Sequence, residues 1–149
     1  MSDSWKEFWS TYRFSGTIRE DLLYEQVGRT LNGRPIPAGE LELSVRFIRE
    51  SLALDHEDVV LELCCGNGLI SYELAGNVKR VIAIDFSDHL IQAAQQFRQH
   101  PNVVYGIGDA LLPLQEWLQG EAPRKFLMAN ALAYFDPEDF DRIDRKSVV

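Results

Sequence analysis

Hydrophobic and polar residues alternate in two different ways along the chain. Over the first 53 residues the apolar side chains recur three or four positions apart, as on one face of a helix. This spacing is clearest at Trp5, Phe8, Trp9 and Tyr12. The pattern predicts helices over residues 3–12, 17–27 and 39–53, with Thr17 as N-cap of the second. The glycine- and proline-rich residues 28–39 are predicted to form a loop.

Beyond residue 54 the pattern changes to short apolar runs separated by helical stretches. Such runs predict buried strands at residues 59–63, 80–85, 102–106 and 125–133. The predicted helices occupy residues 69–75, 87–99 and 114–119 and a stretch that begins at 137. This alternation predicts right-handed crossovers and an α/β fold with a doubly wound parallel sheet. We therefore expect an N-terminal helical arm over 1–54 and one α/β domain over 55–149.

Composition and charge narrow the class of protein. The 149 residues include 46% hydrophobic residues and carry a net charge of −8. Nucleic acid is not an expected partner, because a nucleic-acid surface gathers Lys and Arg on one face. No apolar stretch reaches 18 residues and the start has no apolar signal core, so neither a membrane span nor secretion is expected. The adjacent Cys64 and Cys65 favour a reduced, cytoplasmic setting.

The first candidate functional residues lie where two predicted strands end, the place where doubly wound sheets bind ligands. In the loop 64–68, Gly66 and Gly68 permit a tight turn and a close approach of a ligand to the backbone. Taken alone, this pair equally describes a plain strand-to-helix turn. Asp85 ends the second strand, where a carboxylate can accept hydrogen bonds from both hydroxyls of a ribose. The alternative is an acid that stabilises the N-terminus of the following helix.

Two further carboxylates extend the candidate site. Asp109 follows the third strand and is either an acceptor for an adenine amino group or a solvated loop acid. Glu62 lies inside the first apolar strand, where an unpaired carboxylate is costly, so it predicts a cationic ligand group such as an amino-acid ammonium. A nicotinamide-binding fingerprint instead places a third glycine at the position of Ser71 and needs no acid in the strand. A nicotinamide-dependent oxidoreductase is therefore the weaker alternative.

Three motifs follow one another along the chain: Val-Leu-Glu-Leu-Cys-Cys-Gly-Asn-Gly at 60–68, Val-Ile-Ala-Ile-Asp-Phe-Ser at 81–87 and Gly-Asp-Ala at 108–110. In this order, they resemble the motifs of class I S-adenosylmethionine-dependent methyltransferases. The resemblance covers about residues 40–135 and implies a Rossmann-like sheet with S-adenosylmethionine as cofactor. The cofactor-binding residues it implies are Glu62, Cys64, Gly66, Gly68, Asp85, Phe86, Asp109, Ala110 and Asn130.

The resemblance also implies a role for each part of this set. Glu62 and the loop 64–68 would hold the methionine part of the cofactor, and Asp85 would bind the ribose. Phe86 would lie against the adenine, with Asp109 and Ala110 along the adenine edge. Asn130, near the end of the fourth strand, would lie close to the sulfonium. No spacing predicts a metal site, and no catalytic base is assigned.

Two departures from the family pattern lead to further expectations. The family usually has glycine where this chain has Cys64, and cysteine is tolerable there if the backbone does not need a positive φ. The family sheet has seven strands, whereas this chain supplies about four, so we expect a C-terminally truncated form. Its fourth strand would be an exposed edge, through which a homodimer could form.

The resemblance also implies that the N-terminal helices lie above the cofactor cleft as a lid. Its aromatic stripe either lines an acceptor site or simply packs the arm against the domain. Four arginines, Arg13, Arg19, Arg29 and Arg34, are candidates to bind the cofactor carboxylate or an anionic acceptor. The sequence thus predicts a methyltransferase for a small-molecule acceptor. The main alternative is an S-adenosylmethionine-binding module without catalytic activity.

Overall fold

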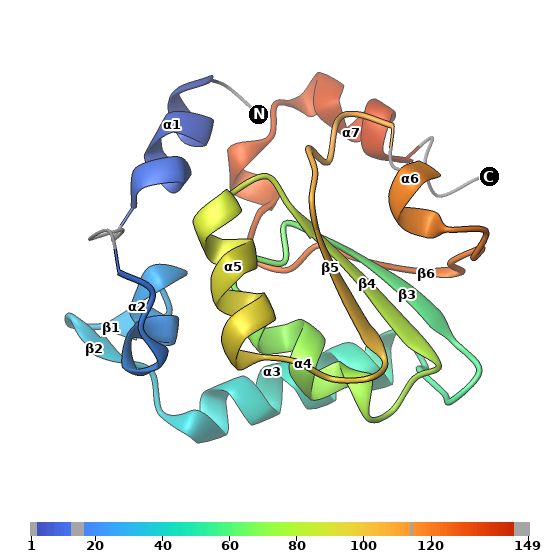
Figure 1. Cartoon of the computed structure of the whole chain (residues 1–149), viewed down its shortest axis with the longest axis horizontal. Coiled ribbons are helices and arrows are strands. Elements are labelled where there is room, and N and C mark those ends of the chain that lie inside the picture. Colours follow the sequence, from blue (N-terminus) through green and yellow to red (C-terminus); the bar gives the residue numbers. More distant parts are fainter. Residues whose placement is uncertain (1–2, 13–16, 114, 145–149) are drawn as a thin grey trace.

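A four-stranded parallel sheet forms the centre of the computed structural model, which describes residues 3–12, 17–113 and 115–144 (Figure 1). The strands are β3 (Val59–Leu63), β4 (Arg80–Asp85), β5 (Val103–Ile107) and β6 (Lys125–Leu127). Their order across the sheet is β5-β4-β3-β6, and each neighbouring pair is parallel. The predicted doubly wound α/β class is confirmed. Because the strand order reverses at β3, a ligand is expected beyond the carboxyl end of this strand.

Helices cover both faces of the sheet (Figure 1). The helices α3 (Ala38–Ser51), α4 (Leu69–Ala75) and α5 (Asp88–Phe97) lie on one side, and α6 (Gln115–Leu118) and α7 (Pro137–Asp144) lie on the other. Alternate positions of each strand serve the two cores. Val60 and Val81 pack toward the first group, whereas Leu61 and Ile82 belong to the second core. Strands whose side chains are apolar at successive positions are therefore buried on both faces of the sheet.

The N-terminal arm differs from the prediction in two places. α1 (Asp3–Thr11) and α3 form as expected. Residues 17–27 do not form one helix capped by Thr17: a 3-10 turn η1 (Glu20–Leu22) precedes a short α2 (Leu23–Gln26). The physical reason is that Arg19 is extended, with φ −132° and ψ 133°, and its side chain bonds to Asp21. A helix therefore begins only after Arg19.

The second difference is a hairpin inside residues 28–39, which were predicted to be a loop. β1 (Thr30–Leu31) pairs antiparallel with β2 (Arg34–Pro35) around Asn32 and Gly33. These two turn residues have φ values of 51° and 74°. A two-residue hairpin loop of type I′ needs positive φ at both central positions, which Asn-Gly adopts readily. The signal for the hairpin was therefore present in the sequence.

The end of the sheet also differs from the prediction. The fourth strand was expected over 125–133, but β6 ends at Leu127 and a 3-10 turn η2 (Leu132–Tyr134) follows. Asn130 has φ +59°, a left-handed conformation that turns the chain away from the sheet. Within the described residues, β6 pairs only with β3 and forms an edge. Whether two copies pair through this edge remains a prediction.

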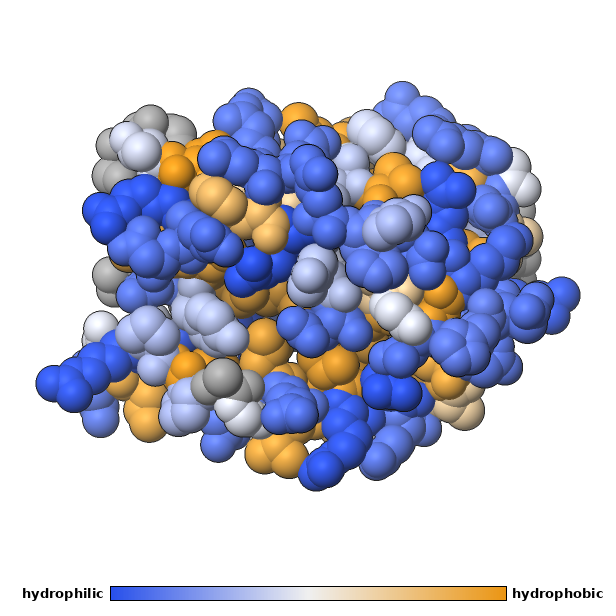
Figure 2. Space-filling view, turned by 60° about the horizontal axis from the view of Figure 1, so that its bottom comes forward, coloured by the Kyte–Doolittle hydropathy of each residue, from blue (hydrophilic) through white to orange (hydrophobic). Residues whose placement is uncertain are grey.

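The surface is mainly polar. In the view of Figure 2, hydrophilic residues cover most of the molecule and hydrophobic residues show between them. Large apolar side chains such as Leu43 and Phe47 on α3 are exposed, and exposed apolar side chains are common in folded domains. Among the helices that the structure describes, none combines the length and the apolar character that crossing a membrane requires.

Candidate functional site

A cavity of about 240 Å³ opens at the carboxyl ends of β3 and β4. Its wall is built from the loop after β3, the end of β4, the segment after β6 and two parts of the N-terminal arm. The predicted cofactor residues that line it are Glu62, Cys64, Gly66, Asp85, Phe86 and Asn130. Gly68, Asp109 and Ala110 were predicted as well but lie outside this lining. Trp9, Arg29, Asn67 and Tyr134 also line the cavity.

The glycines of the loop after β3 are required by backbone shape and by close packing. Gly66 has φ +58°, and a Cβ there would lie 2.9 Å from Cγ1 of Val27. Gly68 has φ +76° and precedes α4, and a Cβ there would lie 2.7 Å from the ring and hydroxyl of Tyr105. Gly66 therefore exposes backbone to the cavity, whereas Gly68 permits the turn into α4 and its close packing against Tyr105.

Asp85 ties the glycine loop to the start of α5. Its Oδ2 accepts a hydrogen bond from the N–H of Gly66 at 2.8 Å, and its Oδ1 accepts one from the N–H of Ser87 at 2.9 Å. Burial raises the pKa of Asp85, and the backbone hydrogen bonds oppose that rise. A carboxylate has about four acceptor positions, so acceptor capacity remains for a ligand in the cavity. Asp85 can therefore bind the N–H of Ser87 at the start of α5 and still contact a ribose, so its two predicted roles are compatible.

Ser87 is the residue before α5, and its side chain makes no capping hydrogen bond to the helix. Its hydroxyl lies 3.0 Å from Nδ1 of His89 instead. The hydroxyl is therefore engaged by His89, and the N–H of Ser87 itself donates to the carboxylate of Asp85.

Glu62 is a buried carboxylate that faces the cavity, with only 2% of its surface exposed. Its Oε2 accepts a hydrogen bond from the hydroxyl of Ser71 at 2.6 Å. Burial raises the pKa of Glu62 to about 7, while the hydrogen bond from Ser71 and the charge of Arg29 act to lower it. Ser71 therefore does more than replace a glycine: its hydroxyl supports the acid, a role that sequence reasoning missed.

Of the three candidate arginines that the structure describes, Arg29 lines the cavity. It lies between α2 and β1, and its backbone N–H donates to the carbonyl of Tyr24 at 2.9 Å. Burial lowers the pKa of Arg29, and the charges of Tyr24 and Glu62 act in the opposite direction. Arg19 pairs with an acid on the surface, Arg34 is exposed in β2, and Arg13 lies outside the described residues. A cation and an anion thus face one cavity, a pattern that suits an α-amino acid.

Asn67 is a second residue that the sequence reasoning did not single out. It is fully buried, and its Nδ2 donates to the carbonyl of Leu23 at 2.6 Å and to Oε1 of Gln26 at 3.2 Å. These bonds fasten α2 of the arm to the glycine loop. The arm is consequently part of the cavity wall, and its position fixes where Arg29 lies.

Cys64 has φ +58°, so the condition under which a cysteine is tolerable at this glycine position is not met. Its side chain is half-buried against the second core. Burial raises the pKa of the Cys64 thiol well above its ordinary value. The thiol is therefore protonated at neutral pH, which disfavours a nucleophilic role for Cys64.

Relief of this strained backbone should be measurable. Cys64→Gly should be at least as stable as the wild type, whereas Cys64→Val should lose about 2 kcal/mol, because a β-branched side chain resists the left-handed region. Chemical denaturation measures both. The matched control is Cys65→Gly, at a neighbouring buried site without positive φ, which should lose stability. A Cys64→Gly variant destabilised by more than about 1 kcal/mol would argue against strain at this position.

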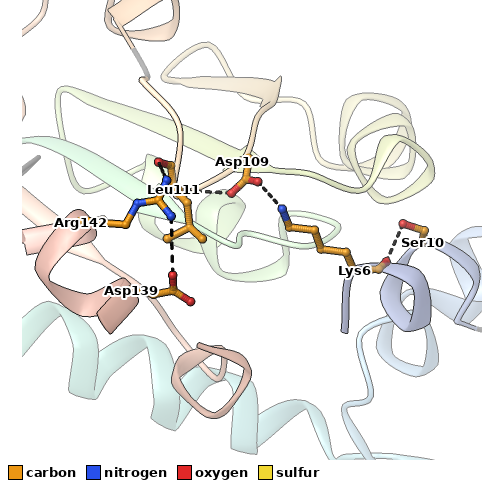
Figure 3. A network of polar contacts seen from close by, with 6 residues as sticks. All are labelled: Lys6, Ser10, Asp109, Leu111, Asp139 and Arg142. Carbon is orange, nitrogen blue, oxygen red and sulfur yellow. Dashed lines mark hydrogen bonds and ion pairs between the residues drawn. The ribbon is translucent and has the colours of Figure 1, made fainter. Parts of the chain in front are cut away.

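Asp109 and Ala110 lie just after β5 and contact other parts of the chain. Oδ1 of Asp109 accepts a hydrogen bond from the N–H of Leu111 at 2.8 Å, and Oδ2 lies 2.6 Å from Nζ of Lys6 on α1 (Figure 3). Ala110 is buried in the second core. Their predicted contact with adenine stays a prediction. Over the described part of the chain, no group of His, Cys, Asp and Glu is arranged to hold a metal ion.

Residues 60–146, from β3 to the end of α7, match the family model described as a methyltransferase domain. The chain belongs to the methyltransferase-domain family. The motifs that resembled class I S-adenosylmethionine-dependent methyltransferases lie largely within the matched residues, and that prediction is confirmed for the family.

Relatives of this methyltransferase domain are longer proteins. The tRNA (uracil-5-)-methyltransferase homolog A of Mus musculus is 36% identical over 85 residues, which are 52% of this chain and 13% of that protein. The phosphoethanolamine N-methyltransferase 1 of Haemonchus contortus, solved with phosphoethanolamine and S-adenosylhomocysteine, has a TM-score of 0.69 at 23% identity over 97% of this chain and 28% of its own. An S-adenosylmethionine-dependent methyltransferase from Anabaena variabilis has a TM-score of 0.67 at 20% identity over 97% and 55%. The two structures show that the methyltransferase domain and its arm share a known fold.

Proposed function

We propose that this methyltransferase domain binds S-adenosylmethionine in the cavity at the ends of β3 and β4 and transfers its methyl group to a small-molecule acceptor. The observation that carries the proposal is the meeting of Glu62, Arg29 and Asp85 at one cavity. Family membership supports the cofactor, since S-adenosylmethionine is the methyl donor implied by the motifs.

The amino-acid end of the cofactor fits Glu62 and Arg29. Its ammonium group would donate to the carboxylate of Glu62, and its carboxylate would accept from the guanidinium of Arg29. Charge-assisted hydrogen bonds of this kind are about twice as strong as neutral ones. The buried Glu62, whose pKa is raised to about 7, gains its missing counter-charge from the ammonium. This arrangement accounts for an acid that is otherwise costly to bury.

The nucleoside end of the cofactor fits the end of β4. Asp85 retains acceptor capacity toward the cavity, so both ribose hydroxyls can donate to its carboxylate. The partly buried ring of Phe86 and the side chain of Leu90 supply apolar surface for the adenine. Polar groups therefore hold the two ends of the ligand, and apolar ones hold the base.

The acceptor side of the cavity is apolar and aromatic. The rings of Trp9 and Tyr134 make an edge-to-face contact with centroids 5.5 Å apart, and Asn130 also lines the cavity. S-adenosylmethionine supplies an electrophilic methyl group, so transfer to an acceptor lone pair needs mainly alignment of the two partners. A small acceptor that packs against these rings is the simplest fit to this wall.

A nucleic-acid acceptor is the second candidate. The 36% identity to a tRNA (uracil-5-)-methyltransferase homolog favours it. The net charge of −8 weighs against it, because binding to phosphates depends on clustered Lys and Arg. Transfer of a labelled methyl group separates the two: label in small molecules supports the first acceptor class, and label in tRNA supports the second. Binding without transfer to either would leave a cofactor-binding module.

Calorimetric titration with S-adenosylhomocysteine tests the cofactor assignment. We expect it to bind, and 5′-methylthioadenosine, which lacks the amino-acid group, to bind at least about 30-fold more weakly, because it loses the bonds to Glu62 and Arg29. NADH serves as the control for the nicotinamide alternative and should not bind. Absence of S-adenosylhomocysteine binding, or equal affinity for the two adenosine ligands, would contradict the assignment.

A further inference from the structure

Arg29 belongs to a unit made of α2 and the β1–β2 hairpin, residues 23–36, which we call the α2–hairpin unit. The backbone of Arg29 is tied to this unit on both sides. Its N–H donates to the carbonyl of Tyr24 in α2 at 2.9 Å, and its carbonyl accepts from the N–H of Ile36 at 3.0 Å. The backbone of Arg29 therefore lies wherever the α2–hairpin unit is placed.

The glycine loop after β3 holds the α2–hairpin unit at two points. Nδ2 of Asn67 donates to the carbonyl of Leu23 at 2.6 Å and to Oε1 of Gln26 at 3.2 Å, so one amide binds both ends of α2. Beside it, Val27 packs so closely over Gly66 that a Cβ on this glycine would lie 2.9 Å from Cγ1 of Val27. The unit is consequently docked on the loop that the proposed function assigns to the cofactor.

The amide of Asn67 is directed at the arm and not at a ligand. Asn67 belongs to the wall of the cavity, but 0% of its surface is exposed. A backbone carbonyl such as that of Leu23 can only accept, so Nδ2 must point toward α2. Oδ1 of the same amide is buried and has no hydrogen-bond partner among the described residues. An unpaired buried acceptor costs stability, so this amide is a poor choice for stability alone.

The guanidinium of Arg29 gains most from a carboxylate when its position is fixed. Charge-assisted hydrogen bonds form at about 2.7–2.9 Å, so a displacement of α2 by about 1 Å would weaken them strongly. Burial lowers the pKa of Arg29, and a carboxylate partner would offset this effect. Whatever holds α2 therefore also controls how well the cavity binds a carboxylate.

We propose that Asn67 is the positioning residue of the carboxylate site: by fastening α2 to the glycine loop it places the guanidinium of Arg29, and so sets the selectivity for ligands that carry a carboxylate. This inference rests on the proposed function, because it takes Arg29 as the group that binds the cofactor carboxylate. The contacts proposed for the ammonium and the ribose come from the sheet, since Glu62 lies in β3 and Asp85 ends β4. Loss of the Asn67 amide should therefore act mainly on one end of the ligand.

The test compares the affinities of the full chain for S-adenosylhomocysteine and for its decarboxylated analogue, which keeps the ammonium group. Calorimetry on the wild-type chain should show a preference of about 10-fold to 100-fold for the ligand with the carboxylate. In Asn67→Ala this preference should fall to about 2-fold or less, as in Arg29→Met, and the double variant should show no further fall. An unchanged preference in Asn67→Ala would overturn the inference even if both affinities drop, because a purely structural loss weakens both ligands alike.

Asn102→Ala is the matched control for the loss of a buried amide. Nδ2 of Asn102 also donates to two carbonyls, those of Ala75 at 3.1 Å and Val78 at 3.2 Å, and none of these residues lines the cavity. This variant should lose stability in chemical denaturation and keep the wild-type preference between the two ligands. An equal fall of the preference in Asn102→Ala and Asn67→Ala would assign the effect to lost stability and overturn the inference.

A milder variant covers the case in which Asn67→Ala does not fold. Gln26→Leu removes the longer of the two bonds to the Asn67 amide and leaves the bond to Leu23. It should lower the preference for the carboxylate ligand by about 3-fold, as the loss of one hydrogen bond predicts. A folded Gln26→Leu chain with the wild-type preference would count against the positioning role.

Failure of the proposed function gives a different result. If the wild-type chain binds neither ligand, the cofactor assignment fails and the inference fails with it. If the wild-type chain binds both ligands with equal affinity, Arg29 does not hold the carboxylate, and the inference is overturned for that reason. When the wild-type chain prefers the ligand with the carboxylate, the variants at Asn67 and Gln26 decide the inference by themselves.

Discussion

At pH 8, the ligand-free Glu62→Gln variant should be more stable than the wild-type chain, and it should bind S-adenosylhomocysteine at least about 50-fold more weakly. The reason for the first effect is that folding buries this carboxylate and raises its pKa from 4.5 to about 7. The stability that Glu62 contributes is fully present below pH 4.5 and is lost as the pH rises through about 7. A neutral amide of the same shape avoids this loss, which amounts to about 3 kcal/mol, and can still bond to Ser71.

The second effect has a separate cause. An amide cannot supply the negative charge that the cofactor ammonium needs, so binding weakens while the fold gains stability. Denaturant titrations at pH 5 and pH 8, together with calorimetry, measure both effects. Glu42→Gln, on the exposed face of α3, is the control and should change neither quantity. A Glu62→Gln variant that is less stable at pH 8 would contradict the raised pKa of this acid, and one that binds normally would show that the acid has no ligand role.

Asp85→Asn should produce the largest loss of binding, about 100-fold or more, together with a loss of stability of about 2–4 kcal/mol. The carboxylate accepts hydrogen bonds from the N–H groups of both Gly66 and Ser87. An amide can accept only one of these bonds and leaves the other N–H facing an NH₂ group. Calorimetry and chemical denaturation measure the two losses. Asp88→Asn, exposed in the first turn of α5, is the matched control and should have little effect.

A ligand change separates the ribose contact from the structural role of Asp85. An S-adenosylhomocysteine analogue without the 2′- and 3′-hydroxyls should bind the wild-type chain much more weakly than the parent ligand. The two ligands should bind Asp85→Asn with nearly equal affinity, because the group that distinguishes them has been removed. If the analogue and the parent differ as much in the variant as in the wild type, Asp85 does not contact the ribose.

The centre of the fold could be predicted from the sequence because its elements are marked locally. Residues 59–63 and 80–85 are apolar runs that end at a loop residue or an acid, and the observed strands have the predicted bounds. Residues 69–75 follow two glycines and form the predicted helix. By contrast, the strand predicted over 125–133 stops at Leu127, because a left-handed Asn130 redirects a segment whose composition remains apolar. Periodicity alone does not reveal such a turn.

The candidate site could be predicted where charged residues occur in otherwise apolar, buried strands. Glu62 lies inside one buried strand and Asp85 ends another, and both line the cavity. The choice of Arg29 among four arginines could not be made, because it depends on the bonds of Asn67 that hold the arm against the glycine loop. The contact between Lys6 and Asp109 joins residues 103 positions apart and has no local signal.

The most direct test of the account is a crystal structure of this methyltransferase domain with S-adenosylhomocysteine at saturating concentration. We expect the ligand at the ends of β3 and β4, with its ammonium group within hydrogen-bond distance of Glu62, its carboxylate at Arg29 and its ribose hydroxyls at Asp85. A ligand bound elsewhere on the chain, or bound in this cavity without contact to Glu62 and Asp85, would contradict the central claim that these two acids form the cofactor site.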